Sequence, residues 1–281
     1  MLVKLADYLS AKHYSPRTIR NYVSELRFLL GYYNDVAPSS IVQEDIVQYL
    51  NYIKKVHGVG RDKCRMACSA FAFFYKHVLP SPYVLPSELY PRKEFRLPNI
   101  LSVAQFAKLY GCISNLKHKA IIGMLYGTGI RLGELRYIKL EDIDRANNQL
   151  KVVCGKGNKD RFTILPKSIL ELLGAYYYQH RPKVYLFEGQ VAGQAMNDRS
   201  IQHAIRQCMQ LAGFEQYKFS AHTLRHSFAT HMLDNGNDIH TIKELLGHSK
   251  IETTMIYLHL QQKKRAALVS PFDVLMQASC K

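Results

Sequence analysis

Five prolines fall within residues 80–99, and they constrain the fold more than any other local feature. They are Pro80, Pro82, Pro86, Pro91 and Pro98. Because proline removes a backbone donor and clashes with the preceding helical turn, no regular helix can run through this segment. A chain of 281 residues is long enough for two domains, each with its own core. We therefore expect an N-terminal domain at residues 1–90, a linker at 91–99 and a second domain at 100–281.

The N-terminal domain is expected to contain helices only. Ser15 precedes Pro16, which is the usual order of an N-cap and the first helical residue. Apolar residues then recur at three- and four-residue steps over 19–33, a pattern typical of an amphipathic helix. Two further helices are expected, one over 46–58 and one after Gly60.

The second domain is expected to be mostly helical, with a small antiparallel β-sheet. Residues 150–154 and 161–165 alternate in polarity and flank a turn-rich segment at 155–160, which predicts a β-hairpin. Ser102 is expected to cap a helix that precedes the hairpin. Everything after about Lys167 is expected to be helical, with the final helices over residues 221–235, 239–246 and 251–260. The fold class is therefore mainly α.

The strongly basic charge points to a polyanionic partner. The net charge is +16 and the isoelectric point is about 9.5. Residues 1–97 hold 14 basic and 8 acidic side chains, and residues 98–281 hold 24 and 14. Since both halves are basic, we expect the two domains to close as a clamp around one polyanion, of which DNA and RNA are the commonest. The basic face formed by Arg61, Lys63, Arg65 and Lys76 could contact phosphates or could simply be solvated.

Several classes of protein are disfavoured by the composition. Asp7 interrupts any apolar core near the N-terminus, so no signal peptide is expected, and no apolar run reaches membrane-spanning length. The six cysteines form no pair of CxxC knuckles, so free thiols are favoured over a zinc site. We expect a cytoplasmic protein that contacts no membrane and needs no cofactor or metal.

A set of six residues in the second domain suits chemistry on a phosphodiester. They are Arg131, Lys156, His222, Arg225, His248 and Tyr257. The set supplies three fixed cations, two imidazoles and one phenol that can act as a nucleophile. Preorganised cations stabilise the negative charge that grows on the non-bridging oxygens during attack. No carboxylate pair that could hold a metal lies nearby, so the set predicts metal-free strand transfer.

The first four of these residues occupy three distinct local contexts. Arg131 follows a glycine-rich turn at a helix start, where it could bind an anion or only pair with Glu134. Lys156 lies between two glycines at the hairpin tip, where it could act as a general acid or simply be exposed; Lys159 is its rival. His222 and Arg225 stand three residues apart and share one side of a helix.

The alternatives for the imidazoles and the tyrosine are structural. His222 and His226 have the spacing of a metal pair, but Thr223 stands where a zinc protease would carry glutamate. His248 follows Gly247 at a helix end and could serve only as a cap. Tyr257 could be one more packing residue among nineteen tyrosines.

Four motifs carry a resemblance that covers nearly the whole chain. They are GTGIRLGEL, GKGNKDR, HTLRHSFATHML and LGHSKIETTMIYLH, in this order and spacing. The chain resembles the tyrosine recombinases of the phage-integrase and Xer type. The resemblance implies a SAM-like core-binding domain, phosphate binding by Arg131 and Arg225, and a general acid at Lys156. It also implies that His222 and His248 assist and that Tyr257 is the nucleophile.

The resemblance implies a reaction as well as a site. Tyr257 would form a 3′-phosphotyrosine with release of a 5′-hydroxyl, and a homotetramer on double-stranded DNA would exchange strands through a Holliday junction. The outcome would be integration, excision, inversion or dimer resolution, with host accessory factors as possible partners. The segment 270–276 resembles a tail that docks into a neighbouring subunit, although docking in cis is the alternative. No arm-binding domain is expected before Met1.

Two other functions remain open on the sequence. A type IB topoisomerase-like enzyme uses a similar set of residues to relax DNA. A DNA-binding accessory protein that lacks catalysis would share the basic charge and the fold. The complete set of six residue types favours the recombinase.

Overall fold

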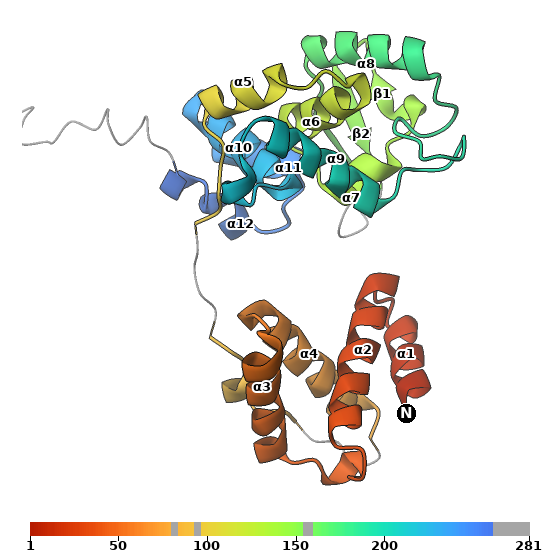
Figure 1. Cartoon of the computed structure of the whole chain (residues 1–281), viewed down its shortest axis with the longest axis vertical. Coiled ribbons are helices and arrows are strands. Elements are labelled where there is room, and N and C mark those ends of the chain that lie inside the picture. The colour runs from red at the N-terminus through yellow and green to blue at the C-terminus, as the bar shows by residue number, and fades with distance from the viewer. Residues whose placement is uncertain (80–83, 93–96, 154–159, 261–281) are drawn as a thin grey trace, which may run out of the picture. The chain divides into compact units, whose positions relative to one another are not determined.

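The computed structural model describes residues 1–79, 84–92, 97–153 and 160–260. The chain forms two compact units, Met1–Phe95 and Arg96–Lys281, hereafter the N-terminal and C-terminal units. Both units are mainly helical (Figure 1). No helix in the described ranges is long and apolar enough to cross a membrane.

The N-terminal unit consists of helices and short 3₁₀ turns. Its helices are α1 (Leu2–Ala11), α2 (Pro16–Tyr32), α3 (Gln43–His57) and α4 (Arg61–His77). Helix α2 packs against both α1 and α4. Fully buried side chains such as Leu26, Phe71 and Phe74 form the core. The expected all-helical character is confirmed, and α1 precedes the first helix that the sequence indicated.

The start of α2 shows how the sequence sets a helix boundary. The Ser15 hydroxyl accepts a hydrogen bond from the backbone N–H of Thr18 at 3.1 Å, and Pro16 is the first helical residue. Gly58 ends α3 with a φ of 60°, a conformation that glycine adopts without a steric penalty. Capping residues therefore place these helices where the sequence predicts them.

The basic face of α4 is partly engaged within its own unit. Lys63 pairs with the buried carboxylate of Glu25. Arg65 donates to the backbone carbonyl of Pro91, and its guanidinium lies 5.8 Å from the centre of the Tyr90 ring. Leu85 is also buried in the N-terminal core. Described parts of the proline-rich segment therefore pack against this unit.

The C-terminal unit combines helices with one small sheet. Its helices are α5 (Val103–Gly111), α6 (Leu116–Thr128), α7 (Leu132–Tyr137), α8 (Lys167–His180), α9 (Asp198–Leu211), α10 (Ala221–Asp234), α11 (Ile239–Leu246) and α12 (Glu252–Met255). Its strands are β1 (Ile143–Asp144), β2 (Gln149–Val152) and β3 (Arg161–Ile164). The three strands are antiparallel in the order β1-β2-β3, so the predicted small sheet is confirmed.

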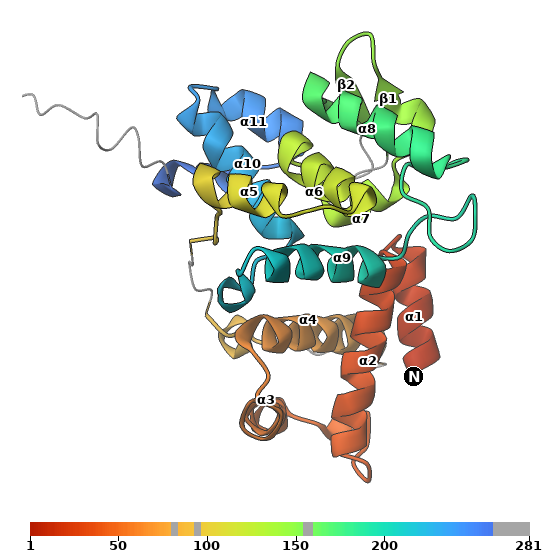
Figure 2. The same ribbon diagram turned by 45° about the horizontal axis from the view of Figure 1, so that its top comes forward.

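Helix α6 is the centre of this unit. It packs against α8, α9 and α10, and its residues from Ala120 to Leu125 are all buried. Helix α8 lies beside the sheet in both views (Figures 1 and 2). Helix α11 packs against β3. Segments that are far apart in the sequence thus meet at the end of α6, where α7 begins.

Two expectations after Lys167 are wrong. Residues 181–197 are not helical; one isolated bridge joins Tyr185 to Lys139, and a second joins Glu188 to Ala195 within the segment. The single helix expected over 251–260 is instead α12 followed by a 3₁₀ turn at Leu258–Leu260, because the backbone leaves the α-helical path near Tyr257. The side chain of Tyr257 is buried against the apolar cluster of α10 and α11.

Candidate active site

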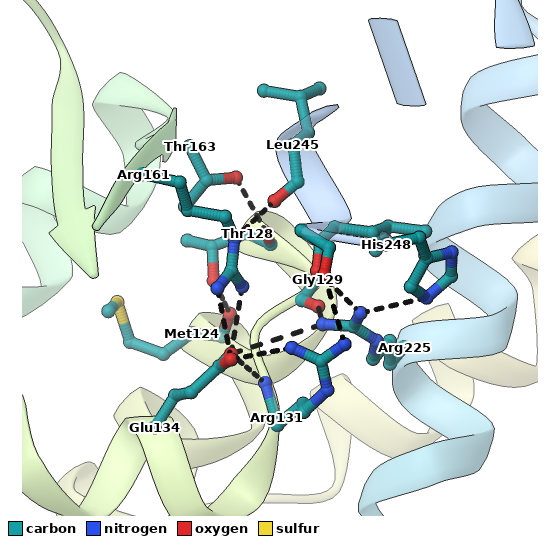
Figure 3. Close-up of polar contacts among 12 residues, drawn as sticks. Met124, Thr128, Gly129, Arg131, Glu134, Arg161, Thr163, Arg225, Leu245 and His248 are labelled. Atoms are coloured by element: carbon teal, nitrogen blue, oxygen red, sulfur yellow. Dashed lines mark hydrogen bonds and ion pairs between the residues drawn. The ribbon is translucent and has the colours of Figure 1, made fainter. Parts of the chain in front are cut away.

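The site is built where the ends of several elements meet. Arg131 precedes α7, Arg225 lies on α10 and His248 follows α11. Tyr257 lies between α12 and the last 3₁₀ turn. Four of the six residues singled out from the sequence therefore converge on one region of the C-terminal unit, in one network of contacts. Figure 3 shows the polar contacts among Arg131, Arg225 and His248.

Gly129 fixes the approach of Arg131 and Arg225. It ends α6 with a φ of 64°, and a Cβ at this position would lie 2.3 Å from Phe228 Cδ1. Its carbonyl oxygen accepts a hydrogen bond from Arg225 Nη1 at 2.6 Å. Glycine is therefore required here both by the backbone conformation and by the packing of α10.

One carboxylate, that of Glu134, ties three guanidiniums together. Arg131 Nη1 donates to Glu134 Oε1 at 2.7 Å, and the Arg131 backbone N–H donates to Oε2 at 2.7 Å. Arg161 binds both oxygens, at 2.9 and 2.8 Å. Arg225 Nη1 lies 4.0 Å from Oε2. The pairing of Arg131 with Glu134, which the sequence suggested as a purely structural role, thus coexists with a position in the cationic cluster (Figure 3).

The arginines keep Glu134 ionised although it is buried. Burial alone would raise its pKa, but the hydrogen bonds from Arg161 and from the Arg131 backbone, together with their charges, lower it to about 2. The four charged groups therefore carry two net positive charges at neutral pH. A cluster with this balance can bind an anion such as a phosphodiester.

The same three arginines also bind three consecutive carbonyls at the end of α11. Arg161 Nε donates to Leu245 O at 2.9 Å, Arg225 Nη2 to Leu246 O at 2.7 Å, and Arg131 Nη2 to Gly247 O at 3.4 Å. Carbonyls in the last turn of a helix have no intrahelical partner, so they are natural acceptors for cationic donors. The arginine cluster consequently fixes the segment from which His248 projects.

His248 is a neutral imidazole in this network. Its Nε2 lies 3.0 Å from Arg225 Nη2, and its Nδ1 lies 2.9 Å from Thr254 Oγ1. Because a guanidinium only donates, Nε2 accepts and the proton is on Nδ1. Burial, followed by the charges of Arg225 and Arg131, lowers the pKa of His248 to about 3. His248 therefore links Arg225 to the helix that leads to Tyr257.

Arg225 itself is 3% exposed. Burial, followed by the nearby charge of Arg131, lowers its pKa to about 10, so it stays protonated at neutral pH. Its terminal nitrogens donate hydrogen bonds to the carbonyls of Gly129 and Leu246 and to His248. A buried cation held in this way is preorganised, since it needs no rearrangement to present its charge.

Tyr257 is 1% exposed, and its hydroxyl lies 2.9 Å from Nδ1 of His226. Burial raises the pKa of the phenol, although the charges of Arg225 and Arg131 act in the opposite direction. Burial, followed by the charges of His222 and Arg225, lowers the pKa of His226 to about 4. At neutral pH the pair therefore consists of a neutral phenol and a neutral imidazole.

His222 lies one turn before His226 on the same face of α10 and is exposed at the surface. Their ring centres are 6.3 Å apart. Local desolvation, followed by the charges of Arg225 and Arg131, lowers the pKa of His222. Across the part of the chain that the structure describes, no group of three or more His, Cys, Asp or Glu side chains could hold a metal ion.

Sequence reasoning missed part of the site. Arg161 was noted only as a strand residue, His226 only as a rejected metal ligand, and Thr254 only as part of a helix. The available signal was position: Arg161 is the first strand residue after the hairpin turn, and His226 shares a helix face with His222. Lys156 lies outside the described residues.

Comparison with known proteins places both units in one family. Residues 99–264 match the phage integrase family, and residues 1–84 match the phage integrase N-terminal SAM-like domain. A tyrosine recombinase XerC from Lacticaseibacillus casei is 31% identical, and the alignment covers 90% of this chain and 92% of that protein.

Solved structures agree with this placement. The crystal structure of the XerA recombinase is 30% identical, with a TM-score of 0.55 over 93% of this chain and 94% of that chain. The fold is also similar to that of a lambda integrase tetramer bound to a Holliday junction, with a TM-score of 0.72, 18% identity and coverage of 91% and 75%. The chain therefore belongs to the phage integrase family and is a site-specific tyrosine recombinase, an enzyme that transfers DNA strands.

Proposed function

We propose that Tyr257 is the nucleophile of this recombinase and that Arg131 and Arg225 bind the phosphodiester that it attacks. The observation that carries the proposal is the cluster of guanidiniums around Glu134, whose net positive charge lies beside a tyrosine phenol. Arg225 is the link, because it binds His248 and its charge acts on the Tyr257 phenol. Fixed cations next to a nucleophile are what a phosphoryl transfer needs.

The proposed first step exchanges one phosphoester for another. The Tyr257 oxygen bonds to phosphorus, the bond to the 5′ oxygen breaks, and the product is a 3′-phosphotyrosine with a free 5′-hydroxyl. Lys156 donates the proton that the departing 5′ oxygen takes up, and His222 hydrogen-bonds a non-bridging oxygen. Because the new ester keeps the phosphodiester linkage, the reverse attack by another 5′-hydroxyl needs no ATP.

The phenol must lose its proton and become exposed during this step. At 1% exposure, the Tyr257 hydroxyl has almost no surface that a DNA phosphate could contact. We therefore propose that Tyr257 turns outward when DNA binds. In the observed position, Nδ1 of neutral His226 accepts the phenolic hydrogen bond, with the imidazole proton on Nε2, and we propose that Nδ1 takes up the phenolic proton as Tyr257 turns outward.

The partner is double-stranded DNA that carries a recombination site, and we propose a homotetramer as the active assembly. Among the structural relatives, lambda integrase forms a tetramer on a Holliday junction, and the XerH recombinase binds a palindromic difH substrate. The segment 270–276 would then dock into a neighbouring subunit; it lies outside the described residues. Integration, excision, inversion and dimer resolution all proceed by this chemistry. A cytoplasmic location and host accessory factors complete the proposal.

A nicked suicide DNA tests the nucleophile. We expect wild-type protein to accumulate a covalent complex whose attachment site maps to Tyr257 by peptide mass spectrometry. Tyr257→Phe should form none while binding DNA as tightly, because only the hydroxyl is lost. Tyr217→Phe is the matched control, since Tyr217 belongs to the same unit but is 44% exposed at the surface. Covalent complex formation by Tyr257→Phe would refute the assignment.

The reaction products test the assembly. Recombined strands from two sites distinguish a recombinase from a topoisomerase-like enzyme, which would return relaxed circles only. Deleting the residues after Ser270 should impair tetramer formation and strand exchange more than binding to a single site. Normal tetramers and normal recombination by the truncated chain would show that the tail packs in cis.

A further inference from the structure

Arg161 is basic and lies next to the hairpin turn, yet its charge points inward. Its side chain is only 11% exposed. Three of its N–H groups are taken by Glu134 Oε1, Glu134 Oε2 and Leu245 O, all between 2.8 and 2.9 Å. This planar, bidentate grip on a carboxylate is specific to arginine.

Glu134 is the group on which Arg161 acts. Its carboxylate is 7% exposed and also binds Arg131 through the side chain and the backbone, with Arg225 at 4.0 Å. A bare carboxylate at this place would neutralise one of the two guanidiniums proposed to bind the phosphate. With Arg161 bound to both of its oxygens, its charge is already compensated. The remaining positive charge of Arg131 and Arg225 is then available to a substrate.

Arg161 also determines the position of His248. It binds the carbonyl of Leu245, which is the first of the three consecutive carbonyls that the arginines hold. A Cβ on Gly247 would lie 2.8 Å from Arg161 Cδ, so the Arg161 side chain passes directly beneath the turn that precedes His248. Arg161 thus connects strand β3, helix α7 and the end of α11 (Figure 3).

We propose that Arg161 is a positioning residue of the strand-transfer reaction: it neutralises Glu134, so that Arg131 and Arg225 keep a net positive charge toward the scissile phosphate. The inference rests on the proposed function, because it assumes that these two arginines bind the phosphate. Arg161 touches neither the substrate nor the nucleophile. It acts through the charge of Glu134 and through the end of α11.

A charge-sensitive substrate pair tests this role. One suicide DNA carries the natural scissile phosphate, and the other carries a methylphosphonate, which has no negative charge at that position. Arg161→Met keeps the length of the side chain and removes the charge. We expect it to form covalent complex on the order of 100-fold more slowly with the phosphate, as for the loss of one donor to a developing anion. With the methylphosphonate, the loss should shrink to a few fold.

A second substitution, at Glu134, tests whether the effect of Arg161 depends on the charge of that carboxylate. Arg161→Met combined with Glu134→Gln removes both charges, so Arg131 and Arg225 again carry two net positive charges. We expect the double variant to cleave the natural phosphate at least about tenfold faster than Arg161→Met. Arg145→Met is the matched control, because Arg145 is an exposed arginine in the turn between β1 and β2. It should behave as wild type on both substrates.

The outcomes separate the possibilities. Equal losses of Arg161→Met on the two substrates, or no gain in the double variant, would overturn the proposal and leave Arg161 with a purely structural role. If Arg161→Met does not fold, as judged by thermal unfolding, the double variant decides, since it also removes the buried carboxylate that Arg161→Met leaves without its bidentate partner. That variant should then stay within about tenfold of wild type, and a larger loss in folded protein counts against the proposal. Failure of the proposed function is distinct, because wild-type protein would then form no complex through Tyr257.

Discussion

The two units of this recombinase are both mainly helical, but they differ in the charged side chains that they bury. Among the described residues of the N-terminal unit, Glu25 is the single buried charged side chain, and Lys63 pairs with it. The rest of that core consists of aliphatic and aromatic side chains. In the C-terminal unit, a buried carboxylate and two nearly buried guanidiniums occupy the place where α6, α7, α10 and α11 meet.

The difference shows what a cluster of buried charges requires of a fold. Buried charges are unfavourable unless they are paired and hydrogen-bonded, so each guanidinium in the C-terminal unit needs a defined partner. The partners are one glutamate, the imidazole of His248 and four backbone carbonyls, those of Gly129, Leu245, Leu246 and Gly247. The N-terminal unit has no such requirement and is stabilised by apolar burial.

The largest expected effect is the decrease of DNA affinity with salt concentration, and its size tests whether both units contact DNA. If the whole chain contacts six to ten phosphates, its affinity should fall about 10³–10⁵-fold between 50 and 200 mM salt. A fragment of residues 96–281 should show a smaller slope of log affinity against log salt, because it lacks the phosphates bound by the N-terminal unit. Fluorescence anisotropy on one DNA site measures both slopes. Equal slopes would remove the N-terminal unit from the DNA interface.

A core substitution in the N-terminal unit should affect stability without affecting chemistry. Phe74→Ala removes a fully buried ring and should lower the free energy of unfolding by about 3–5 kcal/mol. Phe28→Ala is the control, since Phe28 is 58% exposed and its removal should change stability by less than about 0.5 kcal/mol. Urea unfolding measures both values. A change in the rate of covalent complex formation by DNA-bound Phe74→Ala protein would contradict the division between the units.

Removing a buried charge from the C-terminal unit should affect chemistry directly. Arg225→Ala should slow covalent complex formation about 10²–10³-fold, which corresponds to about 2.7–4 kcal/mol of transition-state stabilisation. Glu25→Gln removes the buried charge of the other unit and should leave this rate unchanged. Single-turnover cleavage of suicide DNA at saturating protein measures the rates. An Arg225→Ala rate close to that of wild type would mean that Arg225 has only a structural role.

Acid should destabilise the C-terminal unit more than the N-terminal unit. The folded-state pKa values of His226 and His248, about 4 and 3, lie below the ordinary value of 6.5, so the unfolded chain binds more protons. Their contribution is present above pH 6.5 and is lost as the pH falls through these values. The contribution of Glu134 follows, from pH 4.5 toward about 2. The free energy of unfolding of a fragment of residues 96–281 should therefore fall by several kcal/mol between pH 7 and pH 4.

The matched measurement is urea unfolding of residues 1–95 at the same two pH values. None of the groups just named belongs to that unit, and its buried Glu25 is already paired with Lys63. We expect a smaller change there. Equal acid sensitivity of the two fragments would show that the buried network contributes little to stability.

The sequence predicted elements well where a local signal sets them. The caps at Ser15 and Ser102 and the bounds of α11 follow from residue types at fixed offsets. It failed at residues 181–197, which form no helix and make one bridge to distant Lys139 and one within the segment, between Glu188 and Ala195. It also failed near Tyr257, because burial of one ring against α10 and α11 overrides the helical pattern.

The candidate site shows the same difference between features set by nearby residues and contacts between residues far apart in the sequence. Motif spacing identified Arg131, Arg225, His248 and Tyr257, and the structure brings them together. Their partners could not be derived in the same way. The contact between Arg161 and Glu134 joins residues that are 27 positions apart, and the contact between His226 and Tyr257 joins residues that are 31 apart. Only the packing of α7, α10 and β3 makes these neighbours.

Burial of the Tyr257 hydroxyl would limit cleavage of DNA at sites other than the recombination site. A protein with this charge binds non-target DNA through the backbone and samples many sites before it finds its own. Under the proposed mechanism, the arginines would contact a phosphate during such an encounter while the Tyr257 hydroxyl stays covered and bonded to His226. A complex that dissociates before Tyr257 turns outward leaves the strand unbroken. The residence time on a site, rather than the first contact, then determines where DNA is cut.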